Sequence, residues 1–260
     1  MSAEGLAMEV ESAAERQLLH ERRRHEAFVS TLAHELRQPL SALTHAVEIV
    51  SLVSGSPAAS RAAEIIQRQT RQMTRLIEDL IDAARWAKGK LALQLQRVDV
   101  RHAVTDAARD ATAAVAARGH DLVVSIASKP LWVDADPERL RQVLSNLLDN
   151  AVKYTEPRGR IHLTAARAKT TVTVRVSDTG RGLEPQALAH VFDLFSQVRP
   201  DEGAGLGLGL SVARQIVTLH RGRIEARSEG HGQGSEFIVT LPRARLAGID
   251  RADAGERKCP

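Results

Sequence analysis

Two long stretches in the first third of the chain carry apolar residues at every third or fourth position. The apolar positions of the first stretch are Phe28, Leu32, Leu36, Leu40, Leu43, Val47 and Val50. Those of the second stretch are Ala62, Ile65, Ile66, Met73, Leu76, Ile77, Leu80, Ile81 and Ala84. This spacing is typical of amphipathic helices, and the Gly55-Ser56-Pro57 segment between them predicts a turn. The pattern predicts a helical hairpin whose apolar face a second copy would bury as a four-helix bundle.

Beyond Lys88-Gly89-Lys90 the chain mixes helical and strand-like patterns. Helical periodicity covers 100–117, 137–154 and Ser211–Leu219. Strand-like alternation occurs in Leu122–Ile126, Ile161–Ala165, Val172–Val176 and Phe237–Leu241. This order predicts an α+β sandwich in which helices cover one face of a mixed sheet.

Composition narrows the class of protein. The 260 residues have room for two modest domains, and the single cysteine, Cys259, rules out a disulfide framework and fits a reducing cytosol. No apolar stretch reaches the roughly 18 residues of a membrane-spanning helix, so no membrane segment is expected in this chain. With a net charge of +4 and 3% aromatic residues, a nucleic-acid surface of stacked rings is not expected either.

A histidine on the first helix is a candidate nucleophile. His34 lies nearly opposite Leu32 and Leu36 on a helix, which places it on the solvent face. A neutral imidazole there can attack an electrophile, and the carboxylate of Glu35 can accept its proton. Pro39 is expected to bend the helix just beyond it. The alternative is an ordinary surface histidine, and a zinc site of the His-Glu-x-x-His kind is excluded because position 38 is Gln38.

A polar stripe on the 137–154 helix is a candidate ligand site. Asn146, Asn150 and Lys153 stand at i, i+4 and i+7, so they share one helix face. Amide oxygens suit Mg²⁺, and a lysine adds positive charge near phosphates. The alternative is a solvated polar face without a ligand.

Two glycine clusters follow that helix. Asp178 ends a strand and precedes Gly180 and Gly182, so its carboxylate can accept a hydrogen bond from the exocyclic amine of adenine, where guanine presents an acceptor. A tight turn after a strand is the alternative. The second cluster consists of Gly203, Gly205, Gly207 and Gly209 before a helix, where backbone amides can meet phosphate. It matches neither a Walker loop nor the dinucleotide spacing, and a flexible linker is its alternative.

Five segments together resemble the motifs of two-component sensor histidine kinases, in the order of that family. Ser30–Leu40 resembles the phospho-acceptor H-box, and Asn146–Tyr154 resembles the N-box. Asp178–Gly182, Phe192–Phe195 and Gly203–Leu210 resemble the G1, F and G2 boxes. The resemblance covers about residues 26–242.

The resemblance implies a fold and a set of roles. The fold is a helical hairpin that forms a dimeric four-helix bundle, followed by an α+β sandwich of the Bergerat ATP-binding type. His34 is the phosphoacceptor, Glu35 the general base, and Gln38 stands where many relatives carry Thr or Asn for phosphatase activity. Lys153 assists catalysis, and Mg²⁺ is held through ATP by Asn150 and Asn146. The residues implied in ATP binding are Asn146, Asn150, Lys153, Tyr154, Asp178, Gly180, Gly182, Gly203, Gly205, Leu206, Gly207 and Gly209.

The resemblance also implies domains and partners. We expect an N-terminal transmitter helix (1–25), a dimerisation and phosphotransfer domain (26–88), a linker (89–97), an ATP-binding domain (98–243) and a polar tail (244–260). Residues 196–209 are expected to form a mobile lid over ATP. The partners would be a second copy of the chain and the receiver domain of a response regulator. The chain is expected to be cytoplasmic, on its own or as the cytosolic portion of a longer sensor.

Two other functions compete with this interpretation. ATPases of the gyrase, Hsp90 and MutL superfamily resemble the nucleotide domain, but they use a carboxylate at the position of Asn146 to activate water. An amide cannot act as that base, and those ATPases lack the hairpin with its histidine. A non-catalytic dimeric scaffold is the second alternative, and the intact Asn150, Asp178 and glycines argue against it.

Overall fold

The computed structural model describes residues 36, 39–50, 57–87, 93–194, 196 and 207–244. Within these residues the chain divides into two compact units, one with the hairpin and one with the sheet. Several predicted features lie outside the described residues. They are the 1–25 helix, His34, Glu35, Gln38, most of the 196–209 lid and the 244–260 tail except residue 244.

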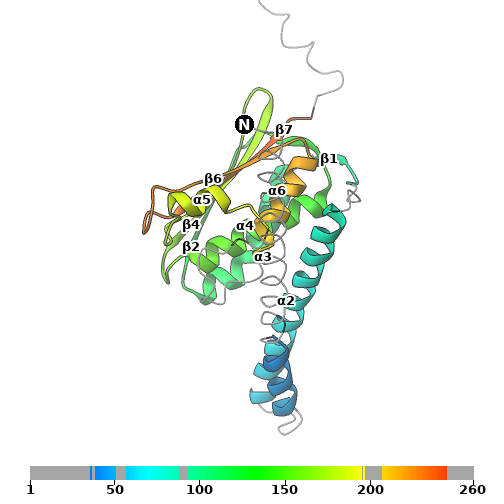
Figure 1. Cartoon of the computed structure of the whole chain (residues 1–260), viewed down its shortest axis with the longest axis vertical. Coiled ribbons are helices and arrows are strands. Elements are labelled where there is room, and N and C mark those ends of the chain that lie inside the picture. Colours follow the sequence, from blue (N-terminus) through cyan, green and yellow to red (C-terminus); the bar gives the residue numbers. More distant parts are fainter. Residues whose placement is uncertain are drawn as a thin grey trace, which may run out of the picture. The chain divides into compact units, whose positions relative to one another are not determined.

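The first unit contains a helical hairpin, as the apolar spacing predicts. Residues 39–50 are helical, and so are the residues of α2 (Pro57–Ala87) (Figure 1). Ala46 and Ala62 are almost fully buried. Larger apolar side chains of the same helices stay in solvent within one copy of the chain. Their exposed fractions are 50% for Leu40, 52% for Val47, 48% for Ile77 and 44% for Ile81.

The second unit is built on a five-stranded mixed sheet. Its strand order is β2-β4-β5-β7-β6. The strands are β2 (Asp121–Ile126), β4 (Arg160–Arg167), β5 (Thr171–Asp178), β6 (Arg223–Arg227) and β7 (Ser235–Pro242). The β2 and β4 strands pair in parallel, and all other neighbours are antiparallel. A separate two-stranded sheet pairs β1 (Gln96–Asp99) with β3 (Trp132–Ala135).

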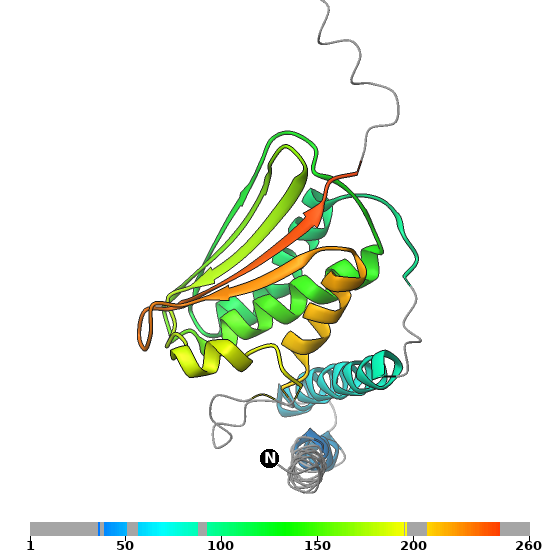
Figure 2. The same ribbon diagram turned by 45° about the horizontal axis from the view of Figure 1, so that its top comes forward.

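Helices cover one face of the five-stranded sheet, as predicted for an α+β sandwich (Figure 2). They are α3 (Val100–Ala117), α4 (Pro137–Tyr154) and α6 (Gly209–Leu219). Alternate strand residues such as Ile161, Leu163 and Val176 point to these helices and are fully buried. Since α4 buries Leu144 and Leu147 against them, its polar face is turned away from the core.

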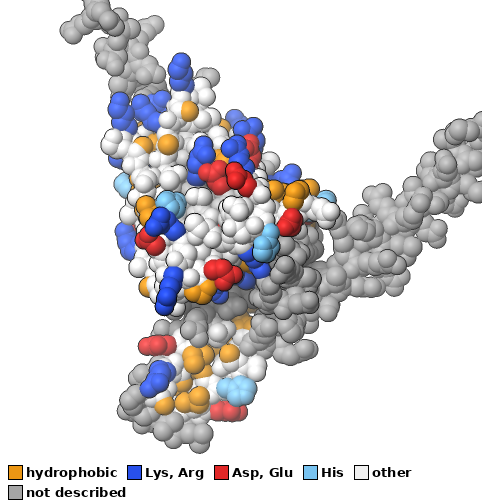
Figure 3. All heavy atoms as spheres, turned by 90° about the vertical axis from the view of Figure 1, so that its left-hand side faces the viewer, with side chains coloured by type: hydrophobic (Ala, Val, Ile, Leu, Met, Phe, Trp, Pro, Cys, Tyr) orange, Lys and Arg blue, Asp and Glu red, His pale blue; other side chains and the backbone are white. Residues whose placement is uncertain are grey.

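The opposite face of the sheet is polar and its charges are paired. Arg175 on β5 lies 3.3 Å from Glu236 on β7, and Arg223 lies 2.6 Å from Glu225 within β6. Figure 3 shows Lys and Arg side chains beside Asp and Glu side chains on one face of the molecule. Ion pairs this exposed contribute little to stability, but they keep this surface from carrying charge of a single sign.

Four short elements were not predicted from the sequence. They are β1, β3, β6 and α5 (Pro185–His190). The strands have four, four and five residues, and the helix has six. Patterns this short carry little periodic signal. A strand this short forms because a neighbouring strand is available to pair with it.

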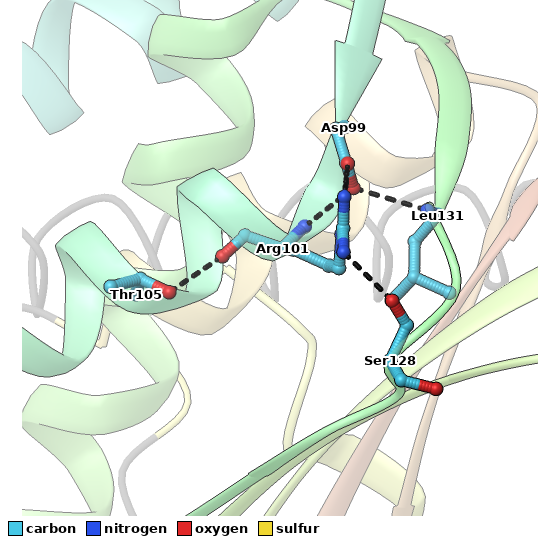
Figure 4. Close-up of polar contacts among 5 residues, drawn as sticks. All are labelled: Asp99, Arg101, Thr105, Ser128 and Leu131. Atoms are coloured by element: carbon cyan, nitrogen blue, oxygen red, sulfur yellow. Dashed lines mark hydrogen bonds and ion pairs between the residues drawn. The ribbon is translucent and has the colours of Figure 1, made fainter.

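A buried carboxylate ties the start of α3 to the loop before β3 (Figure 4). Oδ1 of Asp99 accepts hydrogen bonds from the backbone amides of Arg101 and Leu131, both at 3.1 Å. The Arg101 guanidinium donates to Oδ2 and also to the carbonyl of Ser128 at 2.9 Å. Burial alone would raise the pKa of the Asp99 carboxyl, but the hydrogen bonds from Arg101 and Leu131 outweigh it and lower the pKa.

Candidate active site

Helix α4 presents the predicted ligand residues on one side. Its N-cap is Asp136, whose side chain accepts hydrogen bonds from the amides of Glu138 and Arg139, and Pro137 follows at the first turn. From there the helix runs without a break to Tyr154. Leu147, Leu148 and Ala151 are buried, whereas the predicted residues on the polar side are only partly buried. These are Asn146, Asn150 and Lys153.

Asn146 connects this polar side to the start of α6. Its Nδ2 donates a hydrogen bond to the carbonyl of Gly209 at 2.9 Å. A Cβ at Gly209 would lie 3.4 Å from Cγ of Asn146, an ordinary contact distance, so the start of α6 packs directly against this side chain. A carboxylate could not donate to that carbonyl, so the contact requires an amide. The Asn146 amide oxygen, at the other end of the group, is the end that suits a cation.

Asp178 ends β5 with both carboxylate oxygens held. Oδ1 accepts from the backbone amide of Gly180 at 2.8 Å, and Oδ2 accepts from the hydroxyl of Ser235 at 2.5 Å. Asp178 is only 9% exposed, so its carboxylate is held in a fixed orientation at a largely buried position. A carboxylate fixed in this way acts as an oriented acceptor for a donor on a ligand.

Ser235 is not among the site residues predicted from the sequence. It opens β7, and Asp178 is its partner in the β5–β7 ladder. The Gly234-Ser235 pair at the start of a strand was visible in the sequence. What the sequence did not reveal was that β7 lies beside β5, so nothing linked that serine to the aspartate.

The glycines of this region allow backbone segments to pack closely. A Cβ on Gly180 would meet the carbonyl oxygen of Tyr154, and a Cβ on Gly182 would meet that of Gly230. Gly234, with φ of 71°, would meet the carbonyl oxygen of Asp178. From the sequence, Gly180 and Gly182 are predicted to allow the close approach of a ligand. In the structure both also make room for the protein's own backbone.

Two cations lie beside the ring of Tyr154. The guanidinium carbon of Arg181 is 4.4 Å from the ring centroid, and Nζ of Lys153 is 5.4 Å from it. The backbone amide of Arg181 also donates to the carbonyl of Tyr154 at 3.2 Å. Arg181 was not among the predicted site residues. Its guanidinium adds positive charge over the ring of Tyr154, at the end of α4.

The structure therefore brings together one part of the predicted site. Asn146, Asn150, Lys153, Tyr154, Asp178, Gly180, Gly182 and Gly209 all belong to the sheet-containing unit. Gly207 is described, with φ of 66°, but its placement relative to these residues is not. The roles of His34, Glu35, Gln38, Gly203, Gly205 and Leu206 stay predictions, because these residues lie outside the described part.

Among the described helices, none is sufficiently long and apolar to cross a membrane.

Two family models match the chain. The model described as "Histidine kinase-, DNA gyrase B-, and HSP90-like ATPase" matches residues 135–245. The model described as "His Kinase A (phospho-acceptor) domain" matches residues 24–89. The fold and the residues of the second unit thus define a nucleotide-binding domain of the first kind, joined to a hairpin of the second kind.

Sensor kinases are among the similar proteins. The chain is 36% identical over 225 residues to the sensor histidine kinase TrcS of Mycobacterium tuberculosis, an alignment that covers 83% of this chain and 43% of TrcS. It is 37% identical over 224 residues to the adaptive-response sensory kinase SasA of Thermosynechococcus vestitus, covering 82% of this chain and 59% of that protein. The chain therefore spans only about half of the length of these relatives.

Solved structures agree with this assignment. Full-length ShkA in complex with AMPPNP matches with a TM-score of 0.63 and 29% identity, over 84% of this chain and 46% of ShkA. The catalytic domain of the histidine kinase ThkA matches with a TM-score of 0.53 and 25% identity, over 59% of this chain and 100% of that domain. This protein belongs to the two-component sensor histidine kinases.

Proposed function

We propose that the chain is an ATP-dependent protein-histidine kinase core. It phosphorylates its own His34 and passes the phosphoryl group to an aspartate in the receiver domain of a response regulator. The observation that carries the proposal is the fixed carboxylate of Asp178 beside the polar side of α4. Its two oxygens are held by Gly180 and Ser235, so the group stays oriented to accept the exocyclic amine of adenine.

The residues beside Asp178 fit a magnesium nucleotide. The amide oxygens of Asn146 and Asn150 are hard ligands of the type that Mg²⁺ accepts alongside water and phosphate oxygens. Bound there with ATP, Mg²⁺ would neutralise negative charge on the phosphates. Lys153 and Arg181, both beside the ring of Tyr154, supply the protein's own positive charge for the phosphates. Gly203, Gly205, Leu206, Gly207 and Gly209 are proposed to belong to the lid over the nucleotide.

The chemistry at the histidine is a single phosphoryl transfer. A neutral ring nitrogen of His34 forms a bond to the γ-phosphorus of ATP, the bond to the β,γ-bridging oxygen breaks, and ADP leaves. Glu35 accepts the proton of the other ring nitrogen. The resulting phosphoramidate is labile and can donate its phosphoryl group to a carboxylate of the partner. Gln38 stands at the proposed phosphatase position.

The hairpin is proposed to be the dimerisation domain. Leu40 and Val47 lie seven residues apart on one helix face, and Ile77 and Ile81 lie four apart on α2. All four are large apolar side chains that stay exposed in one copy. Burying them against a second copy would complete a four-helix bundle. We propose the boundaries 26–88 for this domain and 98–243 for the ATP-binding domain, joined by the 89–97 linker.

Incubation with γ-labelled ATP tests the proposal. Wild-type protein should acquire a label that is stable to base and labile to acid. His34→Gln should acquire no label and still bind AMPPNP, whereas Asp178→Asn should lose both labelling and AMPPNP binding. Label on His34→Gln, or an acid-stable label on the wild type, would contradict the assignment of His34.

The same experiment separates the competing functions. Steady release of phosphate without any labelled protein would favour an ATPase of the gyrase and Hsp90 kind. Failure of the wild type to bind AMPPNP would favour a non-catalytic scaffold. Transfer of the label to receiver domains, with loss of transfer when the acceptor aspartate is replaced by asparagine, tests the proposed partner.

A further inference from the structure

The last turn of α4 is held by groups from outside the helix. The final four carbonyls of an α-helix have no partner within the helix. Here the carbonyl of Ala151 accepts from the amide of Thr155 at 3.1 Å and from its hydroxyl at 2.6 Å. The carbonyl of Tyr154 accepts from the amide of Arg181 at 3.2 Å. The two carbonyls between them, those of Val152 and Lys153, are bound by the loop that joins α3 to β2.

Arg118 and His120 make these contacts. Nη1 of Arg118 donates to the carbonyls of Val152 at 3.2 Å and of Lys153 at 2.9 Å. Nε2 of His120 lies 3.1 Å from the same carbonyl of Val152 and donates to it. A guanidinium at this position also places positive charge at the negative end of the helix dipole. The contacts join residues 32 to 35 positions apart in the chain, so they are tertiary and not local.

The loop that carries these donors is itself fixed. Gly119 takes φ of 67° at the end of α3, and its amide donates to the carbonyl of Ala116 at 3.0 Å. The amide of His120 donates to the carbonyl of Val115 at 3.0 Å, and the His120 side chain is buried. Helices α3 and α4 lie side by side in Figures 1 and 2. The loop that supports the end of α4 is thus itself hydrogen-bonded to the end of α3.

We infer that Arg118, assisted by His120, is a positioning residue for nucleotide binding. By holding the carbonyls of Val152 and Lys153 it fixes the backbone from which the side chains of Lys153 and Tyr154 project. Neither Arg118 nor His120 belongs to the motifs that suggest the function, and neither needs to touch the nucleotide. A small displacement of a binding group lowers its contribution steeply, so loss of the support should weaken binding. The inference rests on the proposed function of the same site.

Replacement of Arg118 in the full chain tests this role. The measurement is the Kd for AMPPNP with Mg²⁺, taken well below the melting temperature, together with KM and kcat for labelling by ATP. In Arg118→Ala the Kd and the KM should rise about tenfold, and kcat at saturating ATP should change less than about twofold. Arg118→Lys keeps a charged donor and should recover most of the affinity. Arg118→Gln keeps one donor without charge and should lie between the two.

Two control variants on the same helix separate positioning from stability. Asp99→Ala removes the N-cap at the opposite end of α3 and should lower the melting temperature without changing the Kd. Arg109→Ala replaces an exposed arginine on α3 and should change neither quantity. If Arg118→Ala proves too unstable to assay, the lysine and glutamine variants decide the question against the wild type.

Three results would overturn the inference. The first is a wild-type Kd in Arg118→Ala, or in Arg118→Gln where the alanine variant cannot be assayed. The second is a rise in the Kd of Asp99→Ala that, for the same fall in melting temperature, is as large as the rise in Arg118→Ala. The third is a failure of Arg118→Lys to recover affinity. A wild type that does not bind AMPPNP would instead overturn the proposed function, and this inference with it.

Discussion

The hydroxyl of Ser235 donates a hydrogen bond of 2.5 Å to Oδ2 of Asp178. The two residues face each other across the β5–β7 ladder, although 57 positions separate them in the chain. Because the amide of Gly180 holds Oδ1, the serine completes the fixation of the carboxylate. The orientation of the proposed adenine acceptor thus depends on a side chain from β7, the last strand along the chain.

Removal of this hydroxyl should weaken nucleotide binding. Ser235→Ala frees Oδ2 of Asp178 to turn, and we expect the Kd for AMPPNP to rise about tenfold, since a hydrogen bond to a charged group contributes about 1.5–3 kcal/mol. Ser235→Thr keeps the hydroxyl and should bind nearly as the wild type does. Isothermal titration calorimetry measures both, and equal affinity in all three proteins would exclude a role for the serine.

Gly234 and Gly232 form a matched pair for testing how tightly Asp178 is packed. Both have φ above 70°, so alanine is strained at either position. Only at Gly234 would the added Cβ meet the carbonyl of Asp178, whereas at Gly232 it would meet nothing within 4 Å. Gly232→Ala should cost about 1–2 kcal/mol from the backbone alone and leave AMPPNP binding intact. Gly234→Ala should unfold more readily and lose AMPPNP binding, and a similar effect of the two in denaturant titrations would contradict the packing argument.

Asp99 should make part of the stability depend on pH. Because the pKa of Asp99 is lowered in the folded protein, the stabilisation is present above the unfolded value of 3.8 and is lost as the pH falls through the folded value. Asp99→Asn lacks this contribution. The melting temperature of the wild type should therefore exceed that of Asp99→Asn at pH 7, and the difference should shrink below about pH 4.

Asp106, an exposed aspartate on the same helix α3, offers the control for this measurement. Asp106 pairs with Arg109 at 3.0 Å, and both side chains are largely exposed. Asp106→Asn should follow the wild-type melting temperature across the pH range. A difference between wild type and Asp99→Asn that stays constant from pH 7 to pH 3 would mean that the carboxylate charge is not what stabilises the turn.

Arg221 adopts a backbone conformation that favours glycine. It follows α6 with φ of 56°, and its amide donates to the carbonyl of Thr218 at 2.9 Å. A left-handed conformation costs an ordinary residue about 1–2 kcal/mol in the folded state. Glycine avoids this cost, but its greater freedom stabilises the unfolded chain and offsets part of the gain. Arg221→Gly should therefore stabilise the protein by about 0.5–1 kcal/mol in chemical denaturation. Arg223→Gly, the same substitution within β6, should destabilise it, and a gain at both positions would count against the argument.

Val47 should report on the proposed dimer. It is 52% exposed in one copy, so burying the exposed half of the side chain in a four-helix bundle would contribute about 1 kcal/mol for each subunit. Val47→Glu should shift the protein toward the monomer by at least about tenfold in dimer Kd. Glu48→Gln, at the next exposed position, should remain dimeric. Sedimentation equilibrium distinguishes these outcomes, and an unchanged dimer in Val47→Glu would place the interface elsewhere.

Local patterns in the sequence were enough to predict the long elements. The four predicted strands fall within β2, β4, β5 and β7, and the three predicted helices of this unit match α3, α4 and α6. These elements are long, and their periodicity follows from residues close together in the chain. The short strands β1, β3 and β6 were not predicted, because their formation depends on partner strands distant in sequence.

The sequence by itself determined that Asn146, Asn150 and Lys153 share one side of α4, since residues at i, i+4 and i+7 meet on any α-helix. Only the tertiary structure decided that Ser235 holds Asp178, that Arg181 lies over Tyr154 and that Arg118 supports the end of α4. Each of these contacts joins segments at least 27 positions apart. No local pattern encodes such a contact, because it exists only once the sheet order and the helix packing have brought the two segments together.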